Sequence, residues 1–355
     1  MSVFENRAFD RHEWVSFIED RATGLRAIIA IHSTALGPAG GGIRMYPYSD
    51  SDHALYDVLR LSRAMTCKSA LAGLPVGGGK SVIIGDPRKD KSEPLLEAFG
   101  RAVEALGGRY VCAEDVGTTP EDMAVIRRST RFVVGLPGGS GDTSPLTGYG
   151  VFHAIRAAAR HRLGRDALSG LSVAIQGAGN VGRYLMQHLT EVGAQIHVAD
   201  LDEEATRRAA EDFGAEVVTP DSVLYLDVDV LAPCAMGAVL DDETVPKIRA
   251  KIVCGGANNQ LADDRHGQAL AERGILYVPD YVANAGGVLS GASGLIGMGE
   301  DELRRRVEAI GESCTRVFTR AERNGVAPSV AAERMAREVI EAKSAGTPVG
   351  QATPA

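Results

Sequence analysis

The sequence predicts an α/β protein with two domains, and three observations lead to this fold class. First, 355 residues exceed the usual size of a single domain and suit two. Second, short apolar runs alternate with helical periodicity from residue 171 onward, which is typical of parallel strands joined by crossover helices. Third, residues 135–145 crowd glycine, serine and proline without periodicity, so a domain boundary is expected there. We therefore predict one domain over residues 1–142 and a second over residues 143–328.

The first predicted domain mixes strands and helices. A helix is expected over residues 52–68, capped by Ser51 or Asp52, because its apolar side chains recur on one face. Pro120 opens another helix, at a position where a missing backbone N–H costs nothing. The remaining predicted elements are strands over 24–32, 81–84 and 109–112 and a helix over 94–106.

The second predicted domain begins with a helix over residues 149–161. Its later part repeats the strand and helix alternation, so a parallel sheet is expected. The elements predicted beyond residue 200 are strands over 228–231, 252–254 and 275–278 and helical stretches over 300–324 and 329–343.

Composition excludes several classes of protein. Hydrophobic residues make up 45% and charged residues 24% of the chain, as in a globular protein, and the net charge is −8. An acidic chain without a basic run is not expected to bind nucleic acid or an anionic membrane. The N-terminal segment is charged throughout and no run of about 18 apolar residues occurs, so neither a signal peptide nor a membrane span is expected. Five cysteines without metal-binding spacing favour reduced thiols, a cytoplasmic location and no structural metal.

A glycine motif inside a strand–helix–strand pattern is the strongest functional signal. The apolar run 171–175 leads into Gly177-Ala-Gly179-Asn180-Val181-Gly182, a helical pattern follows, and a second apolar run ends at Asp200. This is the G-x-G-x-x-G arrangement in which glycines allow a tight turn and close approach to a pyrophosphate at a helix start. A carboxylate at the position of Asp200 accepts hydrogen bonds from a ribose 2′-hydroxyl and repels a 2′-phosphate, so the predicted cofactor is NAD rather than NADP.

A second glycine cluster, Gly77-Gly78-Gly79-Lys80-Ser81, has a different meaning. A phosphate-binding loop ending at Lys80 would need glycine at position 74, which is leucine, so that interpretation fails. We expect instead a glycine-walled site that presents the Lys80 amine to a substrate.

Two lysines and an aspartate suit one chemical task. One of Lys68 and Lys80 can hold a substrate carboxylate as a point charge, and the other can act as an acid or base in a dry site. Asp115 can exchange protons with an amine. Together these groups match removal of hydride from the α-carbon of an amino acid.

The order of the motifs resembles the amino-acid dehydrogenase superfamily of glutamate, leucine, phenylalanine and valine dehydrogenases, with leucine dehydrogenase the nearest likeness and phenylalanine dehydrogenase next. The likeness runs from about residue 10 to about residue 343. The motifs that carry it are Gly37-Pro-Ala-Gly40-Gly41-Gly42-Ile-Arg44-Met, Met65-Thr-Cys-Lys68, Gly77-Gly-Gly-Lys80-Ser-Val-Ile-Ile-Gly-Asp-Pro, Ala113-Glu-Asp115-Val-Gly-Thr-Thr, Ala232-Pro-Cys234-Ala235, Gly256-Ala-Asn258-Asn259-Gln and Asn284-Ala-Gly-Gly287.

The resemblance implies an N-terminal substrate domain and a Rossmann-like NAD domain separated by a cleft that closes. It also implies a C-terminal helix, 329–355, that packs back onto the first domain, and a homo-oligomer. The expected reaction is reversible: L-amino acid, NAD⁺ and water give a 2-oxo acid, ammonium and NADH.

Residue roles follow from the same resemblance. Lys68 matches the lysine that holds the α-carboxylate, Lys80 the catalytic lysine and Asp115 the proton shuttle. Asn284 matches an asparagine near the substrate amine and the nicotinamide ribose. The remaining positions matched to the cofactor are Cys234, Ala235, Asn258 and Asn259.

Pocket positions carried over from the family are Gly40, Gly41, Ala113 and Gly291. Without a cation at Gly40, the side-chain carboxylate of glutamate would be buried unpaired, so a hydrophobic amino acid is expected. Glycine at both 40 and 291 predicts a roomy pocket that favours bulky or aromatic side chains. The alternative is that neighbouring side chains refill the space. Segment 290–299 lacks the acidic residues of the leucine pattern.

Two other function classes remain open from the sequence. An NAD-binding regulatory module without turnover would be expected to lack one of Lys68, Lys80 and Asp115, yet all three are present. A hydroxy-acid dehydrogenase usually uses a histidine base, and no histidine lies near the glycine clusters.

Overall fold

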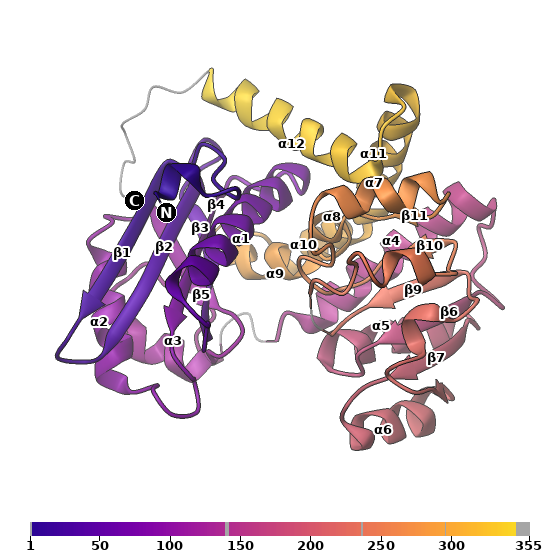
Figure 1. Ribbon diagram of the computed structural model, residues 1–355, viewed down its shortest axis with the longest axis horizontal. Coiled ribbons are helices and arrows are strands. Elements are labelled where there is room, and N and C mark those ends of the chain that lie inside the picture. Colours follow the sequence, from indigo (N-terminus) through magenta and orange to yellow (C-terminus); the bar gives the residue numbers. More distant parts are fainter. Residues whose placement is uncertain (1, 139–141, 236, 295, 346–355) are drawn as a thin grey trace. The chain divides into compact units, whose positions relative to one another are not determined.

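The computed structural model describes residues 2–138, 142–235, 237–294 and 296–345 (Figure 1). Its contacts divide the chain into two compact units. The first contains the elements up to α3, and the second contains α4 (Ser144–Leu163) and the elements up to α11. The last helix, α12 (Pro328–Ser344), is shared, because its residues from Ala336 onward group with the first unit. Among the described residues, the helices are too short or too polar to cross a bilayer.

The first unit is built around a mixed sheet. Its elements in chain order are η1 (Val3–Glu5), β1 (Trp14–Asp20), β2 (Leu25–Ser33), β3 (Ala39–Tyr46), α1 (Ser51–Leu71), β4 (Gly77–Ile84), α2 (Glu93–Glu104), β5 (Tyr110–Glu114) and α3 (Pro120–Arg127). The strand order is β1-β2-β4-β3-β5. Strand β2 runs antiparallel to both β1 and β4, whereas β3 is parallel to both β4 and β5.

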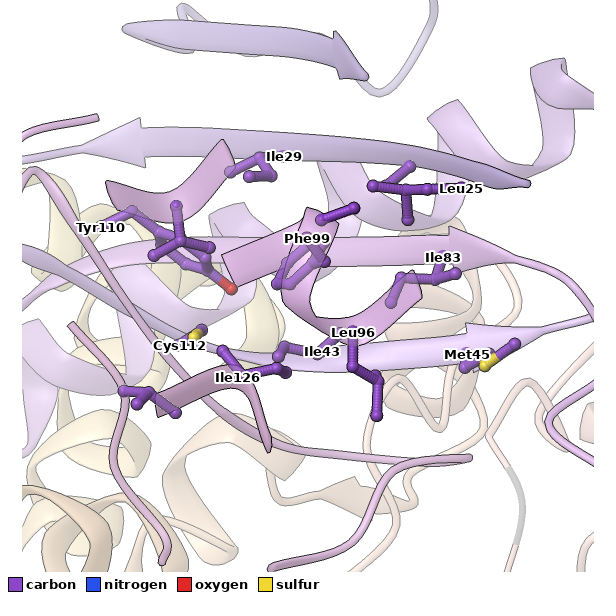
Figure 2. Close-up of a cluster of buried hydrophobic side chains, with 14 of the residues drawn as sticks. Leu25, Ile29, Ile43, Met45, Ile83, Leu96, Phe99, Tyr110, Cys112 and Ile126 are labelled. Atoms are coloured by element: carbon purple, nitrogen blue, oxygen red, sulfur yellow. The ribbon is translucent and has the colours of Figure 1, made fainter. Parts of the chain in front are cut away.

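Different helices cover the two faces of this sheet. On one face, alternate residues of the strands join α2 and α3 in an apolar core that includes Ile29, Ile43, Phe99 and Tyr110 (Figure 2). On the other face, Ile28, Ala30 and Val82 pack against apolar residues of α1. Because side chains alternate along a strand, Lys80 shares the α1 face with Val82. The sequence predicted α1 correctly in kind, although Asp50 is its N-cap and it extends to Leu71.

The glycine cluster before Lys80 is strand rather than loop, which corrects the prediction that the strand begins at residue 81. A Cβ on Gly78 would lie 2.2 Å from the Thr66 backbone nitrogen, and one on Gly41 would lie 1.8 Å from the Gly79 oxygen. These positions therefore admit only glycine, because α1 and β3 approach β4 at backbone distance.

The second unit is a parallel sheet covered by helices. Its elements after α4 are β6 (Ser172–Gln176), α5 (Asn180–Glu191), β7 (Gln195–Ala199), α6 (Glu203–Phe213), β8 (Glu216–Val217), η2 (Val223–Tyr225), β9 (Val230–Pro233), η3 (Val245–Lys247), β10 (Ile252–Val253), α7 (Arg265–Glu272), β11 (Leu276–Tyr277), α8 (Asp280–Ala283), α9 (Gly286–Ser293), α10 (Glu300–Glu308) and α11 (Ile310–Asn324).

The strand order β8-β7-β6-β9-β10-β11 is the 3-2-1-4-5-6 order of a doubly wound nucleotide-binding sheet. All its pairs are parallel, so the predicted α/β class with a Rossmann-like second domain is confirmed. The predicted helix over 300–324 is wrong in one respect, since it breaks at Ala309 into α10 and α11. Residues 346–355 of the predicted C-terminal helix lie outside the described residues, as do residues 139–141 of the predicted boundary loop.

Candidate active site

The α1 face of the first sheet gathers most of the polar residues singled out in the sequence. Gly40, Gly42 and Arg44 alternate along β3, beside Lys80 on β4 and Ala113 on β5. Gly42 pairs with Ala113 in the parallel register of β3 and β5. Strand pleating therefore directs these residues to one side, because side chains two apart share a face.

Lys80 and Asp115 form a buried ion pair. Lys80 Nζ lies 2.8 Å from Asp115 Oδ2, and the two side chains are 7% and 16% exposed. Burial alone would raise the pKa of Asp115, but the Lys80 ammonium and the Arg44 guanidinium outweigh it and hold that pKa well below its usual range. Asp115 is therefore ionised at neutral pH and can accept a proton only when its cationic partners change.

Gly42 permits this pair to form. A Cβ at that position would lie 2.7 Å from Asp115 Cβ and 3.0 Å from Lys80 Nζ. Real Cβ contacts are longer, so any side chain at position 42 would displace the pair.

The loop after β5 fixes the backbone of Asp115. Thr118 Oγ1 accepts a hydrogen bond from the Asp115 backbone N–H at 3.0 Å and donates to the Ile43 carbonyl at 2.9 Å. Gly117 has φ +83°, and a Cβ there would meet the Met45 carbonyl oxygen at 2.1 Å. The Asp115-Val-Gly-Thr segment therefore holds the carboxylate against β3.

Sequence reasoning missed the continuation of this ion pair. Arg44 Nε donates to Asp115 Oδ2 at 3.2 Å, and Arg44 NH1 donates to Asp57 Oδ2 at 3.0 Å. Tyr48 OH also donates to Asp57 Oδ2, at 2.6 Å. A signal was available, because Arg44 follows Gly40 and Gly42 at the two-residue spacing of one strand face. Asp57 had no such signal, since its meeting with Arg44 depends on how α1 lies over the sheet.

Lys68 is buried on α1, with 8% of its surface exposed. It lies eleven residues after Asp57, close to three helical turns, so both occupy one stripe of α1. Two residues before Lys68, Thr66 packs on Gly78, which lies two residues before Lys80. This contact holds the end of α1 against the strand that carries Lys80.

The glycines assigned to the pocket differ in their surroundings. A Cβ on Gly40 would lie 2.9 Å from Val76 Cγ1, so a neighbouring side chain occupies that space. A Cβ on Gly291, in α9 of the second unit, would meet nothing within 4 Å. Gly41 faces the opposite side of β3 from Gly40, where the Gly79 backbone abuts it.

In the second unit, the glycine motif forms the turn between β6 and α5. Gly177 has φ +106°, and a Cβ there would lie 2.8 Å from the Ala235 nitrogen and 2.9 Å from the Cys234 carbonyl carbon. A Cβ on Gly182 would lie 2.0 Å from the Gly177 oxygen, whereas one on Gly179, the N-cap of α5, meets nothing within 4 Å. The turn after β6 thus touches the segment after β9 where the strand order reverses, which is where such sheets bind dinucleotides.

Asp200 lies at the end of β7 beside this turn. Its Oδ2 accepts from the Ala178 backbone N–H at 2.7 Å, and its Oδ1 accepts from the Asp202 N–H at 3.0 Å. The carboxylate is therefore oriented by backbone donors from the turn and from the start of α6.

Asn284 has a fixed amide orientation. Its Nδ2 donates to the Gly256 carbonyl at 3.1 Å and to Asn258 Oδ1 at 2.8 Å. A carbonyl can only accept, so the NH₂ group must face it and Oδ1 becomes an acceptor. Asn284 is 3% exposed and its Oδ1 has no hydrogen-bond partner. An orphaned buried acceptor of this kind fits a ligand that donates hydrogen bonds.

The neighbouring segments complete this group. Cys234 Sγ accepts from the Gly256 N–H at 3.4 Å, and burial raises the pKa of the Cys234 thiol to about 11, so it is neutral. Asn259 has φ +50° and its N–H donates to the Asp280 carboxylate. Val181 packs where a Cβ on Gly256 would be, at 2.5 Å.

These residues fit a dinucleotide. A tight glycine turn, an open helix start at Gly179 and an oriented carboxylate are the three parts that hold pyrophosphate and ribose in sheets of this order. The described residues contain no cluster of three or more His, Cys, Asp or Glu side chains that could hold a metal ion.

Residues 12–132 match the Glu/Leu/Phe/Val dehydrogenase dimerisation domain, and residues 138–206 and 197–344 match the Glutamate/Leucine/Phenylalanine/Valine dehydrogenase domain. A leucine dehydrogenase from Bacillus cereus is 48% identical over 343 residues, 96% of this chain and 94% of the relative. A valine dehydrogenase from Streptomyces virginiae is 48% identical over 333 residues, 92% of this chain and 93% of the relative.

Solved structures agree with this result. The L-tryptophan dehydrogenase from Nostoc punctiforme has a TM-score of 0.80 and 42% identity, covering 94% of this chain and 97% of that one. A hetero-hexameric glutamate dehydrogenase from Thermus thermophilus has a TM-score of 0.78 and 25% identity, covering 96% and 91%. The chain therefore belongs to the Glu/Leu/Phe/Val dehydrogenase family and is an amino-acid dehydrogenase.

Proposed function

We propose that this protein catalyses the reversible, NAD-dependent oxidative deamination of a hydrophobic L-amino acid. The observation that carries the proposal is the buried contact of 2.8 Å between Lys80 Nζ and Asp115 Oδ2, on a sheet face kept open by glycine. An amine and a carboxylate in hydrogen-bond contact can pass a proton between substrate and site, which deamination requires and simple dinucleotide binding does not.

Lys68 is assigned to the substrate α-carboxylate. A buried ammonium pairs with a carboxylate as a point charge, and the packing of Thr66 on Gly78 keeps the end of α1 against β4. Substrate binding through Lys68 would orient the α-carbon relative to Lys80.

Lys80 and Asp115 are assigned to proton transfer. Removal of hydride from Cα leaves an iminium, and Lys80, in its neutral form at this step, takes a proton from the water that adds to it. Asp115 then relays this proton from Lys80 to the nitrogen of the carbinolamine. The C–N bond breaks as Lys80 takes the hydroxyl proton, which releases ammonia and the 2-oxo acid. The nicotinamide, when bound, accepts the hydride. Burial strengthens each of these charge interactions, because less water screens them.

The cofactor assignment rests on the second unit. The Asp200 carboxylate, held by the Ala178 and Asp202 N–H groups, would repel a 2′-phosphate and accept from a 2′-hydroxyl. Asn258, Asn259 and the Cys234-Ala235 segment are assigned to the same cofactor. We assign NAD rather than NADP, and the orphaned Oδ1 of Asn284 to a donor on the substrate amine or the nicotinamide ribose.

The accepted side chain is assigned from the glycine positions. In the first unit Val76 fills the space beside Gly40, whereas in the second unit the space beside Gly291 is open. Of the two glycines, therefore, Gly291 alone supports room for a bulky side chain. No cation replaces Gly40, which disfavours glutamate. Ala113 lies on the same face and adds little bulk. We expect kcat/KM for phenylalanine to equal or exceed that for valine.

A homo-oligomer in a reducing compartment is part of the proposal. Residues 12–132 match a domain named for dimerisation, and all five cysteines are free. Light scattering at several protein concentrations would test the oligomer, and a concentration-independent monomer would oppose it.

The decisive experiment is NADH formation across twenty L-amino acids, with NADP⁺ and 2-hydroxy acids as parallel co-substrates. We expect activity with hydrophobic amino acids and NAD⁺, and a requirement for ammonium in the reverse direction. A regulatory module would bind NADH without turnover, and a hydroxy-acid dehydrogenase would not need ammonium. Lys80→Ala and Asp115→Asn should lose turnover while retaining NADH binding. Normal rates in Lys80→Ala would refute the assigned chemistry.

A further inference from the structure

Two cationic side chains contact the same carboxylate oxygen of Asp115. Lys80 Nζ lies 2.8 Å and Arg44 Nε 3.2 Å from the same atom, Asp115 Oδ2. Both contacts are largely removed from solvent, since the Arg44 and Asp115 side chains are 19% and 16% exposed. The two cations differ in kind, because a lysine can lose its proton in a protein and an arginine does not.

Arg44 is itself held in place from the other side. Its NH1 donates to Asp57 Oδ2, which also accepts from Tyr48 OH. Burial and the Asp57 carboxylate raise the pKa of Tyr48, so its hydroxyl stays a neutral donor. Planar guanidinium groups bound at two ends have little rotational freedom, so this contact fixes the position of Nε against Asp115.

We propose that Arg44, oriented by Asp57, is a positioning residue that keeps Asp115 ionised and aligned while Lys80 loses and regains its proton. This inference rests on the proposed function for its role in turnover, but its electrostatic content can be tested without turnover. Were Lys80 the only cation, its deprotonation would leave the Asp115 carboxylate buried and unpaired, which is costly. Arg44 supplies a charge that does not change during the reaction.

Titratable groups near Asp115 lie on several elements of the first unit. They are Lys80 from β4, Arg44 from β3, Asp57 from α1, Tyr48 from the segment after β3, and Tyr110 and Cys112 from β5. Burial raises the pKa of both Tyr110 and Cys112, so neither carries charge near neutral pH. The ionic side chains among these groups are therefore Lys80, Arg44 and Asp57.

This arrangement predicts shifts of opposite sign. Arg44→Met removes a positive charge and should move the acid limb of the kcat/KM profile upward by about one to two pH units. Asp57→Asn removes the charge that neutralises Arg44 and should move the limb downward by a smaller amount. Arg44→Lys should return the acid limb of the kcat/KM profile toward its original position, because the positive charge is kept. Its kcat should be lower than that of the unmodified chain, because lysine lacks the planar guanidinium that contacts Asp115 and Asp57 together.

An ion pair away from the site provides matched controls. Arg101 on α2 contacts Asp20 at 3.4 Å, and the two side chains are 58% and 31% exposed. Arg101→Met and Asp20→Asn remove the same charges from the first unit without touching Asp115. Both should leave the pH profile unchanged.

A second measurement does not depend on activity. Acylation of the Lys80 amine is followed across pH by peptide mass spectrometry, and the Arg44→Met curve should lie at higher pH and the Asp57→Asn curve at lower pH than the unmodified chain. If the acylation curves of the two variants coincide with that of the unmodified chain, or move in the same direction, the proposal is overturned. Arg44 would then only link β3 to α1 through its contact with Asp57. If Arg44→Met does not fold, the sign of the Asp57→Asn shift decides. If the protein shows no deamination at all, the proposed function fails while the acylation curves still report on Arg44.

Discussion

Gly42→Ala tests whether turnover depends on the close contact between Lys80 and Asp115. The added Cβ would lie 2.7 Å from Asp115 Cβ, 2.8 Å from the Glu114 oxygen and 3.0 Å from Lys80 Nζ. Non-bonded carbons are comfortable at about 3.5 Å or more, so Asp115 must retreat by roughly 0.8 Å. Glu114 carries the rigid backbone of β5, so the displacement falls on the two side chains.

A displacement of this size has a predictable kinetic cost. A misplacement of about 1 Å in a catalytic group can lower the rate on the order of 10²-fold, so kcat for the preferred amino acid should fall by about that factor. Overpacking should also cost about 1–3 kcal/mol of stability. The Kd for NADH should stay the same, because the glycine turn at Gly177 belongs to the second unit.

The assay compares initial rates of NADH formation, fluorescence titration of NADH and urea unfolding in three proteins. Gly107→Ala is the matched control, since Gly107 has φ +60° and no atom within 4 Å of its would-be Cβ. That change costs backbone strain of about 1 kcal/mol without contacting the site, so kcat should hold. If Gly42→Ala folds and keeps kcat within about threefold, the Lys80–Asp115 contact does not limit turnover and the reasoning fails.

Three further outcomes follow from the described contacts. Gly182→Ala should weaken NADH binding at least tenfold, about 1.4 kcal/mol, because its Cβ would meet the Gly177 oxygen at 2.0 Å; an unchanged fluorescence titration would contradict this. Asp200→Ser should raise the NADP⁺ to NAD⁺ ratio of kcat/KM, which a NADP⁺ titration measures, and an unaltered ratio would remove Asp200 from the specificity assignment. Burial lowers the pKa of His12 to about 4, so the unfolded chain binds a proton below its usual pKa of about 6.5 that the folded chain does not. The free energy of unfolding should therefore fall by about 3 kcal/mol as pH drops from about 6.5 to about 4. Urea unfolding at several pH values should show a weaker dependence of this free energy on pH in His12→Gln; the same dependence in both proteins would exclude His12 as the cause.

The parts that sequence reasoning predicted are those with local signals. The turn at Gly177 is specified by residues next to it in the chain, so its motif predicts its conformation. The parallel sheet of the second unit follows from alternation of apolar runs. Both were confirmed by the strand order and by the φ of +106° at Gly177.

The strands that were missed carry misleading composition. β3 (Ala39–Tyr46) contains three consecutive glycines, which read as turn, yet a Cβ on Gly41 would collide with the β4 backbone. β1 (Trp14–Asp20) is an edge strand with exposed apolar residues, and its mixed pattern indicates no buried face. Glycine in β3 reflects close approach of another chain segment, which only the fold determines.

The break between α10 and α11 had only a weak signal in the sequence, the glycine at position 311. Ala309 is an ordinary helix former and the flanking charged pattern continues through it. A Cβ on Gly311 would lie 3.1 Å from the His153 carbonyl oxygen, so α11 approaches α4 closely just after the break. Tertiary packing of this kind overrides helix propensity.

The resemblance predicted that Lys80 and Asp115 act together, but it did not predict the charged side chains around them. Lys80, Asp115, Arg44 and Asp57 alternate in sign across a buried face, with successive contacts of 2.8, 3.2 and 3.0 Å. Buried charges are tolerated when each has a partner, and removal of one typically costs about 3–5 kcal/mol. A lysine that releases its proton during turnover would break a simple pair. In the proposed mechanism, Asp115 keeps its contact with Arg44 when Lys80 becomes neutral. The row of alternating charges therefore extends beyond Lys80 and Asp115, the two residues that exchange the proton. This is why the site can be buried and still transfer a proton.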